Sequence, residues 1–320
     1  MNIVLLDRGN PIPALKYGGT ERVIWGLGLE LTKLGHNVTF IVPKGSICPF
    51  AKVIEYDTTV NMNSLFPIDT DIVHLSFVPD YEIDYPHIVT MHGNKRIDDK
   101  FDLNTVFISE NHAKRHHSDI YVYNGLVWED YPKVELNKSR EYLHFLAKAS
   151  WKVKNLSGAA KIAIQSKNKL KVMGGEKWTF YNMKRKPFYT LHPNVKYMGQ
   201  VDDIQKIKVM QESKGLLFPV LWNEPFGLAL IESLYAGCPV FGTKKGSLPE
   251  IINENVGFLS DDENEIITAI VEKKFSPQTC HDYAVTHFNA KVMTENYIKL
   301  YEKVISGENL NKTIPYEHQH

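Results

Sequence analysis

Two glutamates with seven residues between them stand in the most informative stretch of this sequence. Glu224 follows an apolar run that ends at Val220, and Glu232 lies in an apolar segment expected to be a helix from about Phe226 to Tyr235. A carboxylate only accepts hydrogen bonds, so it is suited to hold two neighbouring hydroxyls of a sugar. Eight residue steps of helix rise roughly 12 Å. The pair could therefore grip the two ends of an elongated polar ligand.

The start of this helix is suited to an anion. Pro225 stands where a missing N–H matters least, and Gly237 comes just past the expected end. Free backbone N–H groups near Phe226, Gly227 and Leu228 would face a negative group at the positive end of the helix dipole. The segment predicts a ligand with a sugar, a diphosphate and a ribose in line. Two isolated glutamates would more simply be a helix cap and a solvated residue.

The surrounding residues resemble the nucleotide-sugar site of retaining glycosyltransferases of family 4, also called glycosyltransferase group 1. That signature is Glu, seven residues and Glu, with Pro-Phe-Gly-Leu after the first, and the match continues through Ala236–Val240 and Gly246–Glu250. The resemblance implies that Glu224 contacts the donor sugar and that Glu232 binds the ribose. It also implies a UDP- or GDP-sugar as donor substrate, no further cofactor, and the GT-B fold.

Two features of the N-terminal half resemble the same family. Gly18 and Gly19 follow the first expected strand, where glycines let the backbone approach a bulky anion closely. A tight turn that needs positive φ is the alternative. In the family this loop meets the donor diphosphate. His92 ends another expected strand, and the resemblance implies that it contacts the donor sugar, although a histidine in this place is more often structural.

Lysines after the first strand of the C-terminal half are the expected phosphate ligands. The family has Gly-Arg there and Lys-Gly a few residues later, whereas this chain replaces both glycines and the arginine. The resemblance implies that Lys148 and Lys154 hold the diphosphate, with Lys152 as the competing residue. A departing nucleoside diphosphate without a metal needs a cation beside it. The base is expected to lie against backbone groups near Gly199.

Short apolar runs alternate with helical patterns along most of the chain. Such alternation predicts parallel sheets with right-handed crossovers, and two successive series predict two doubly wound domains. We expect an N-terminal, acceptor-side Rossmann-like domain over 1–130 and a C-terminal, nucleotide-sugar-binding Rossmann-like domain over 131–290, facing a cleft. Residues 291–320 are expected to hold a last helix and a loose tail. The resemblance implies that this helix crosses back to the first domain.

The expected elements follow from these runs. The strands are expected at 2–6, 37–42, 71–77, 87–93, 105–109 and 120–125 in the first series, and at 141–148, 168–174, 195–199, 214–220, 238–242 and 257–260 in the second. A helix with apolar residues at helical spacing is expected from Thr20 to Leu34, with Thr20 as its N-cap and Gly35 as its stop. Ligands bind at the carboxyl ends of the strands in such sheets.

Composition and charge limit the range of partners. The 320 residues are 43% hydrophobic and 23% charged with zero net charge, which is typical of a globular protein without general affinity for nucleic acid. The basic excess lies in 129–190, where a basic face could touch anionic lipid. Three distant cysteines fit a reducing compartment. The expected location is the cytoplasm, with peripheral contact at the inner face of the membrane left open.

No metal site is expected. Asp69 and Asp71 form an Asp-x-Asp motif, which holds a divalent ion in the metal-dependent glycosyltransferases of the other major fold. Here the motif runs directly into a strand and is interpreted as turn chemistry. His112, His116 and His117 lie on a polar helical segment, and they lack carboxylates or cysteines arranged as further ligands.

The sequence therefore predicts a retaining, metal-independent glycosyltransferase, as in polysaccharide biosynthesis. It would move a sugar from a nucleoside diphosphate to a hydroxyl of a glycan, a lipid-linked sugar or a small molecule. Glu224, His92 and Lys154 are the expected catalytic residues. Two alternatives stay open: a catalytically inactive binding or accessory subunit of the same fold, and a non-hydrolysing sugar-nucleotide epimerase, which would need no acceptor.

Overall fold

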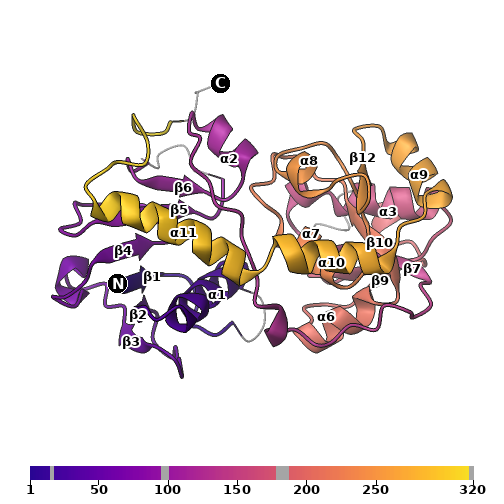
Figure 1. The fold of residues 1–320 in the computed structure, drawn as a ribbon. Helices are drawn as coiled ribbons and strands as arrows, with labels where there is room; N and C mark the ends of the chain where they lie inside the picture. The colour runs from indigo at the N-terminus through magenta and orange to yellow at the C-terminus, as the bar shows by residue number, and fades with distance from the viewer. Residues whose placement is uncertain (15–17, 95–100, 178–186, 317–320) are drawn as a thin grey trace. The chain divides into compact units, whose positions relative to one another are not determined.

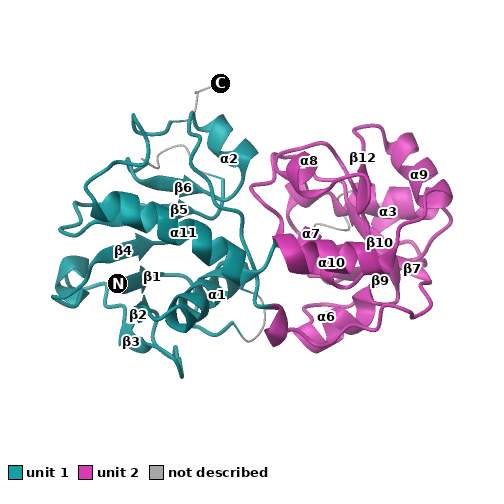
Figure 2. Ribbon diagram, viewed as in Figure 1, with its two compact units in different colours: residues 1–127, 288–320 teal, residues 128–287 magenta. Residues whose placement is uncertain are grey.

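The computed structural model describes residues 1–14, 18–94, 101–177 and 187–316 (Figure 1). The chain forms two compact units, coloured separately in Figure 2. Unit 1 comprises Met1–Val127 together with Phe288–His320, and unit 2 comprises Trp128–His287. The sequence placed the boundaries at 130/131 and 290/291. Each unit is described below by itself.

Unit 1 is built on a six-stranded parallel sheet in the order β3-β2-β1-β4-β5-β6. Its strands are β1 (Asn2–Leu6), β2 (Asn37–Val42), β3 (Lys52–Glu55), β4 (Ile72–Leu75), β5 (His87–Met91) and β6 (Thr105–Phe107). The inner strands β1 and β4 are apolar on both faces, as expected for a sheet covered on both sides. The chain order reverses between β1 and β4, which is the topological switch point of this sheet.

Two long helices pack against each other in unit 1. They are α1 (Gly19–Lys33) and α11 (Ala290–Ile305), seen together in Figure 1, and α11 also packs on β5. Tyr301 of α11 hydrogen-bonds Nδ1 of His74 at 2.7 Å, and Tyr297 bonds the Thr90 hydroxyl at 3.0 Å. Because both tyrosines are buried, these bonds fix the last helix on the first unit.

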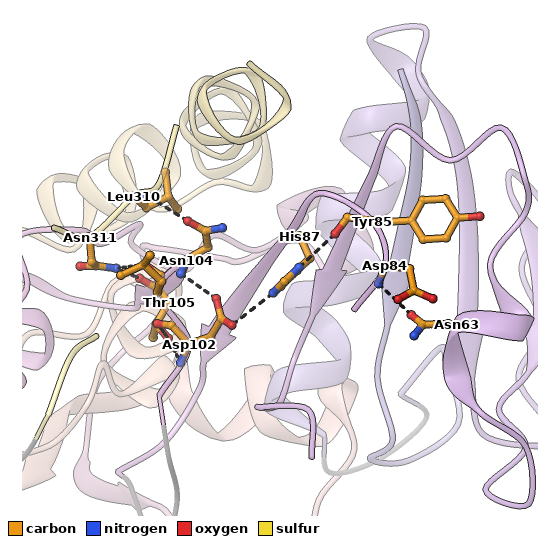
Figure 3. Close-up of polar contacts among 10 residues, drawn as sticks. Asn63, Asp84, Tyr85, His87, Asp102, Asn104, Thr105, Leu310 and Asn311 are labelled. Carbon is orange, nitrogen blue, oxygen red and sulfur yellow. Dashed lines mark hydrogen bonds and ion pairs between the residues drawn. The ribbon is translucent and has the colours of Figure 1, made fainter. Parts of the chain in front are cut away.

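The C-terminal segment is attached to unit 1 rather than loose as far as it is described. The Asn311 side chain donates to the carbonyl of Thr105 at 2.9 Å, and the N–H of Leu310 donates to Oδ1 of Asn104 at 2.9 Å (Figure 3). Tyr316 N–H reaches the carbonyl of His116. The expectation of a loose tail is therefore wrong up to residue 316, since an asparagine here satisfies backbone groups beside β6.

Unit 2 repeats the same topology with the order β12-β11-β10-β7-β8-β9. Its strands are β7 (Tyr142–Leu146), β8 (Leu170–Met173), β9 (Val195–Tyr197), β10 (Ser213–Phe218), β11 (Val240–Gly242) and β12 (Gly257–Leu259). The switch point lies between β7 and β10, which pair in parallel. Their apolar residues and those of the covering helices form one core cluster, which includes Leu143, Phe145, Leu217 and Phe241.

The remaining helices connect these strands. Unit 2 holds α3 (Leu156–Gln165), α5 (Pro187–Thr190), α6 (Asp203–Met210), α7 (Leu228–Tyr235), α8 (Leu248–Ile251), α9 (Glu263–Glu272) and α10 (Pro277–His287), with 3₁₀ turns η2 (Trp128–Asp130) and η3 (Lys152–Lys154). Unit 1 also holds α2 (Glu110–Arg115) and the 3₁₀ turn η1 (Met62–Leu65). Among the described residues, no helix combines the length and apolarity that a membrane span requires.

Several expected details were wrong. Residues 120–125 are not a strand, because only Tyr121 makes an isolated bridge to Phe107, and the edge strand β3 was not predicted. The cap of α1 is Gly18, without a side-chain hydrogen bond, rather than Thr20, which lies inside the helix. His112 and His116 are fully buried rather than on a polar face, and their rings pack on Phe107.

Candidate functional site

The candidate site lies at the switch point of unit 2. The loop after β7 ends in η3, which carries Lys154, and the loop after β10 carries Glu224. Since β7 and β10 are parallel neighbours, their carboxyl ends lie at one edge of the sheet, and the loops that follow them diverge to opposite sides. Such an edge is where open α/β sheets bind ligands.

Glu224 is held by two donors from these loops. Nζ of Lys154 lies 2.8 Å from Oε1 and 2.6 Å from Oε2, and the indole N–H of Trp222 donates to Oε2 at 2.7 Å. The pair is secluded, because the Glu224 side chain is 7% exposed and that of Lys154 is 12% exposed. Nζ also lies 4.9 Å from the centre of the Trp222 ring. The acid is thus fixed in place and close to a cation.

A second loop fixes the backbone around Glu224. Ser247 N–H donates to the Glu224 carbonyl at 2.9 Å, and the Ser247 hydroxyl donates to the Phe226 carbonyl at 2.8 Å. Gly246 has a φ of 62°, and a Cβ placed there would lie 2.2 Å from the Glu224 nitrogen. Only glycine fits such a position without backbone movement. The Gly-Ser-Leu-Pro-Glu stretch therefore shapes the loop that presents Glu224.

The helix after Glu224 begins later than predicted. Gly227 is its N-cap with φ at 83°, and α7 starts at Leu228 instead of about Phe226. Half of the path from Glu224 to Glu232 is therefore loop, and the predicted helical rise does not apply to it. Among the described residues, no acceptor bonds the backbone N–H groups of Gly227 and Leu228. These donors lie at the N-terminus of a helix, where an anion is favoured.

Glu232 has an arrangement that parallels that of Glu224. Its Oε1 accepts from the Tyr131 hydroxyl at 2.8 Å and from Nζ of Lys206 at 2.5 Å. Lys206 also pairs with Asp203 at 2.9 Å. The side chains of Glu232 and Lys206 are each 10% exposed. Glu232 is thus a second secluded acid with its own cation, four residues into α7.

Asn155 links the two loops of the switch point. Its backbone is left-handed, with φ at 55° and ψ at 49°, a conformation that asparagine tolerates better than most residues with a side chain. Its side chain donates to the Pro219 carbonyl at 2.9 Å and accepts from Gly158 N–H at 3.1 Å. Asparagine therefore serves where the glycosyltransferase resemblance expects glycine, and it ties η3 to the end of β10.

Comparison with known proteins identifies the family that this part of the chain resembles. Residues 127–281 match the family described as "Glycosyl transferases group 1". This segment belongs to that family. It contains both acids and both lysines of the candidate site.

Relatives and solved structures extend the likeness. An uncharacterized 41.2 kDa protein in the cps region of Klebsiella pneumoniae is 31% identical over 120 residues, which is 34% of this chain and 32% of that protein. The matched segment spans about a third or less of the curated relatives. AviGT4, a glycosyltransferase involved in avilamycin A biosynthesis, has a TM-score of 0.79 at 20% identity and covers 96% of this chain and 98% of its own. Anabaena Alr3699/HepE in complex with UDP-glucose has a TM-score of 0.65 at 16% identity, covering 96% of this chain and 100% of its own. The fold is that of the GT-B glycosyltransferases.

Other predicted residues of the group 1 segment lie around the pair. Lys148 is exposed on the loop after β7, with Nζ 5.2 Å from the Trp151 ring centre, and Lys152 is exposed at the start of η3. Neither lysine forms an ion pair with Glu224 or Glu232, whereas Lys154 does. Gly199 has φ at 72°, with open space where a Cβ would stand, and its carbonyl accepts from Gly174 N–H at 2.8 Å.

The predicted residues of unit 1 lie at the carboxyl edge of its own sheet. Gly18 has an extended φ of 169°, so a positive φ does not explain it; a Cβ there would instead lie 2.9 Å from both Ala14 Cβ and Oε2 of Glu21. Gly19 is the first residue of α1. His92 follows β5, and burial lowers the pKa of its imidazole to about 4. Within the described residues its Nε2 has no hydrogen-bond partner.

Sequence reasoning missed several residues of these sites. Trp222, Tyr131 and Lys206 hold the two acids, but only Trp222, two residues before Glu224, stands close enough in sequence to be suspected. Asp7 was also missed, although it follows β1 directly. Burial, aided by the nearby charge of Glu21, raises the pKa of the Asp7 carboxyl to about 6.

The motifs considered for metals have other roles. Asp71 accepts from the backbone N–H of Asn2 at 2.7 Å, and the Asp69 carbonyl accepts from the Asn2 side chain at 2.8 Å, so both serve the turn before β4. Across the part of the chain that the structure describes, no three His, Cys, Asp or Glu side chains are arranged to hold a metal ion.

Proposed function

We propose that this protein is a retaining, metal-independent glycosyltransferase that uses a nucleoside diphosphate sugar. The observation that carries the proposal is the pair of secluded acids in the group 1 segment, each with a lysine, at the switch point of unit 2. Carboxylates accept from hydroxyls and lysines attract phosphate. The similarity in fold to HepE, whose structure holds UDP-glucose, supports this class of donor.

Each residue has a proposed role along the donor. Glu232 accepts from the ribose hydroxyls, and the base lies against the backbone near Gly199. Lys154, assisted by Lys148, faces the diphosphate. Glu224 and the N–H groups near Phe226, Gly227 and Leu228 contact the sugar. Gly18, Gly19 and His92 lie in unit 1, and their donor contacts stay predictions from the family resemblance.

The proposed reaction is a front-face substitution. The acceptor hydroxyl oxygen forms a bond to C1 of the sugar while the bond from C1 to the phosphate oxygen breaks, and the hydroxyl proton passes to that phosphate oxygen. The products are a glycoside with the same anomeric configuration and a nucleoside diphosphate. Lys154 stabilises the negative charge that develops on the leaving group, and the other residues position the reactants.

The acceptor is proposed to be a carbohydrate or a glycolipid. The cps-region relative favours a role in polysaccharide biosynthesis, which would place the protein in the cytoplasm where activated sugars are made. Peripheral contact with the membrane would follow if the acceptor is lipid-linked. The nature of the acceptor is open to a direct screen of oligosaccharides and lipid-linked sugars.

Turnover measurements test the proposal. The purified chain is incubated with UDP- and GDP-sugars, with and without acceptors and with EDTA, and release of the nucleoside diphosphate is followed. We expect acceptor-dependent release that EDTA leaves unchanged, and NMR of the product should show a retained anomeric configuration. Interconversion of the sugar nucleotide without acceptor would indicate an epimerase instead. Binding that stabilises the protein without any turnover would indicate an inactive subunit.

Variants then test the roles of the lysines and acids. Glu232→Ala should raise the KM for the donor, because ribose contacts are made equally in the ground and transition states. Lys154→Ala should lower kcat, because its charge matters most as the leaving group departs. Lys152→Ala is the matched control, an exposed lysine two residues away. If Lys152→Ala impairs turnover and Lys154→Ala does not, the assignment of the diphosphate lysine is wrong.

A further inference from the structure

The two acids of the site share an arrangement that the proposed roles do not use. Each acid accepts hydrogen bonds from one lysine and from one aromatic side chain. The aromatic donor is the indole N–H of Trp222 for Glu224 and the hydroxyl of Tyr131 for Glu232. The two aromatic residues come from separate segments, the loop after β10 and the turn that follows η2. The lysine alone would balance the charge of each acid, so charge balance does not explain why an aromatic donor is also present.

We propose that Trp222 and Tyr131 are positioning residues, which orient Glu224 toward the donor sugar and Glu232 toward the ribose. The inference rests on the proposed function and deepens it. A lysine is a flexible point charge that follows its partner through many geometries. An aromatic donor has only two rotatable side-chain bonds, so it fixes the direction of the bond it makes.

Trp222 is placed to restrict Glu224. Its ring stands edge-on to Trp151 with centroids 6.2 Å apart and has the Lys154 ammonium 4.9 Å from its centre. A carboxylate offers about four acceptor sites. Glu224 uses two on Oε2 and one on Oε1, so one site on Oε1 remains for a hydroxyl of the sugar. The indole N–H thereby selects which oxygen faces the ligand.

Tyr131 is placed to restrict Glu232 in the same way. Its ring is buried against the edge of a stacked pair: Trp128 lies at 5.3 Å and Tyr235 at 5.8 Å between centroids, and those two rings stack on each other at 4.5 Å. The Tyr131 hydroxyl and the Lys206 ammonium both bond Oε1. Among the described residues Oε2 accepts no hydrogen bond. Both acceptor sites of Oε2 thus stay available, which suits the two hydroxyls of a ribose.

Loss of each aromatic donor should consequently weaken the contacts to a different part of the ligand: the sugar for Trp222 and the ribose for Tyr131. Loss of the Trp222 N–H lets Glu224 rotate away from the sugar while nucleotide contacts persist. Loss of the Tyr131 hydroxyl lets Glu232 rotate away from the ribose, which every ligand with a ribose would register. This separation distinguishes positioning from a general loss of structure.

Isothermal titration with the full chain tests the inference. The probes are UDP-glucose, UDP and 2′-deoxy-UDP, or the guanine set if GDP rather than UDP raises the melting temperature of the wild type. Trp222→Phe should weaken UDP-glucose about tenfold, as for loss of a hydrogen bond to a charged group, and leave UDP within twofold. Tyr131→Phe should weaken UDP by roughly five- to tenfold and reduce the preference for UDP over 2′-deoxy-UDP.

Each variant is the matched control for the other. Trp222→His keeps a ring N–H and should recover part of the lost affinity for UDP-glucose, and in a Glu224→Ala background, which removes the acceptor, Trp222→Phe should have no further effect. Equal weakening of all three probes by either variant, or no weakening by both, would overturn the inference while leaving the proposed function intact. If the wild type binds neither nucleotide set, the proposed function fails and this inference fails with it.

Discussion

Unit 1 should lose stability steeply as the pH falls from 7.5 to 5.5, because three of its histidines are buried without charge. Burial lowers the pKa of His74 to about 3 and that of His92 to about 4, and it lowers the pKa of His112 well below 6.5. The unfolded chain takes up these protons near pH 6.5, whereas the native unit does not. Unfolding is therefore favoured by about 1.4 kcal/mol per histidine at pH 5.5 relative to pH 7.5.

Two other groups of unit 1 act in the opposite direction. Burial raises the pKa of Asp7 to about 6, so the native unit binds this proton first and regains roughly 1 kcal/mol at pH 5.5. For His87, burial lowers the pKa, but the bond to Asp102 outweighs it and the net pKa is raised (Figure 3). That ion pair is partly exposed and adds little. The net loss is about 2–3 kcal/mol, a large share of the 5–15 kcal/mol typical of a domain.

The variant His112→Phe isolates one of these histidines. Phenylalanine suits the site, since His112 is buried 5.0 Å from the Phe107 ring. The stability difference between variant and wild type should shift by about 1.4 kcal/mol in favour of the variant between pH 7.5 and 5.5. Hydrogen exchange of peptides from β4 and β5 reports on unit 1 alone. His192→Phe, at a partly exposed position in unit 2, is the control for a histidine replacement outside unit 1. An unchanged difference for His112→Phe at both pH values would refute the reasoning.

Three further predictions concern stability. Lys154→Met should destabilise unit 2 by about 3–5 kcal/mol in thermal or denaturant unfolding, because it leaves Glu224 buried and unpaired; a loss as small as that of Lys152→Met would contradict this. Gly246→Ala should cost about 3 kcal/mol or more, since the new Cβ would strike the Glu224 backbone. Gly199→Ala shares the positive φ but meets open space, so calorimetry should give only about 1 kcal/mol, and equal losses would argue against a clash. Tyr301→Phe should lower the stability of unit 1 by about 1–2 kcal/mol, because His74 loses its partner in α11; hydrogen exchange in β4 that stays at the wild-type rate would show that this bond is unimportant.

Local patterns were enough to predict most of the fold. Apolar runs bounded by polar turns identified the inner strands of both sheets, and the last helix was expected in the C-terminal segment that holds nearly all of α11. The edge strand β3 was missed because only two of its residues, the partly buried Val53 and Ile54, are apolar, and exposed charged residues flank them. Residues 120–125 were taken for a strand because they are rich in aromatic and β-branched residues, but only Tyr121 pairs with the sheet, through a single bridge to Phe107.

The site was predictable only where its residues are close in sequence. Glu224, Glu232 and Gly246 lie within one continuous stretch, so their spacing carried the prediction. Lys206 and Tyr131 reach Glu232 from α6 and from the start of unit 2, and nothing local in the sequence marks them. Long-range side-chain pairs of this kind follow from the sheet order, which a single sequence does not specify.

The path of the chain between the units has a consequence for synthesis. Unit 2 is inserted between Val127 and Phe288, and α11, which completes unit 1, is translated only after all of unit 2. During synthesis, the surface of the N-terminal sheet that Tyr297 and Tyr301 cover therefore stays exposed until α11 is translated. The inserted unit 2 can fold before that point. A premature stop near residue 287 would accordingly leave the group 1 segment intact, whereas unit 1 would lack α11.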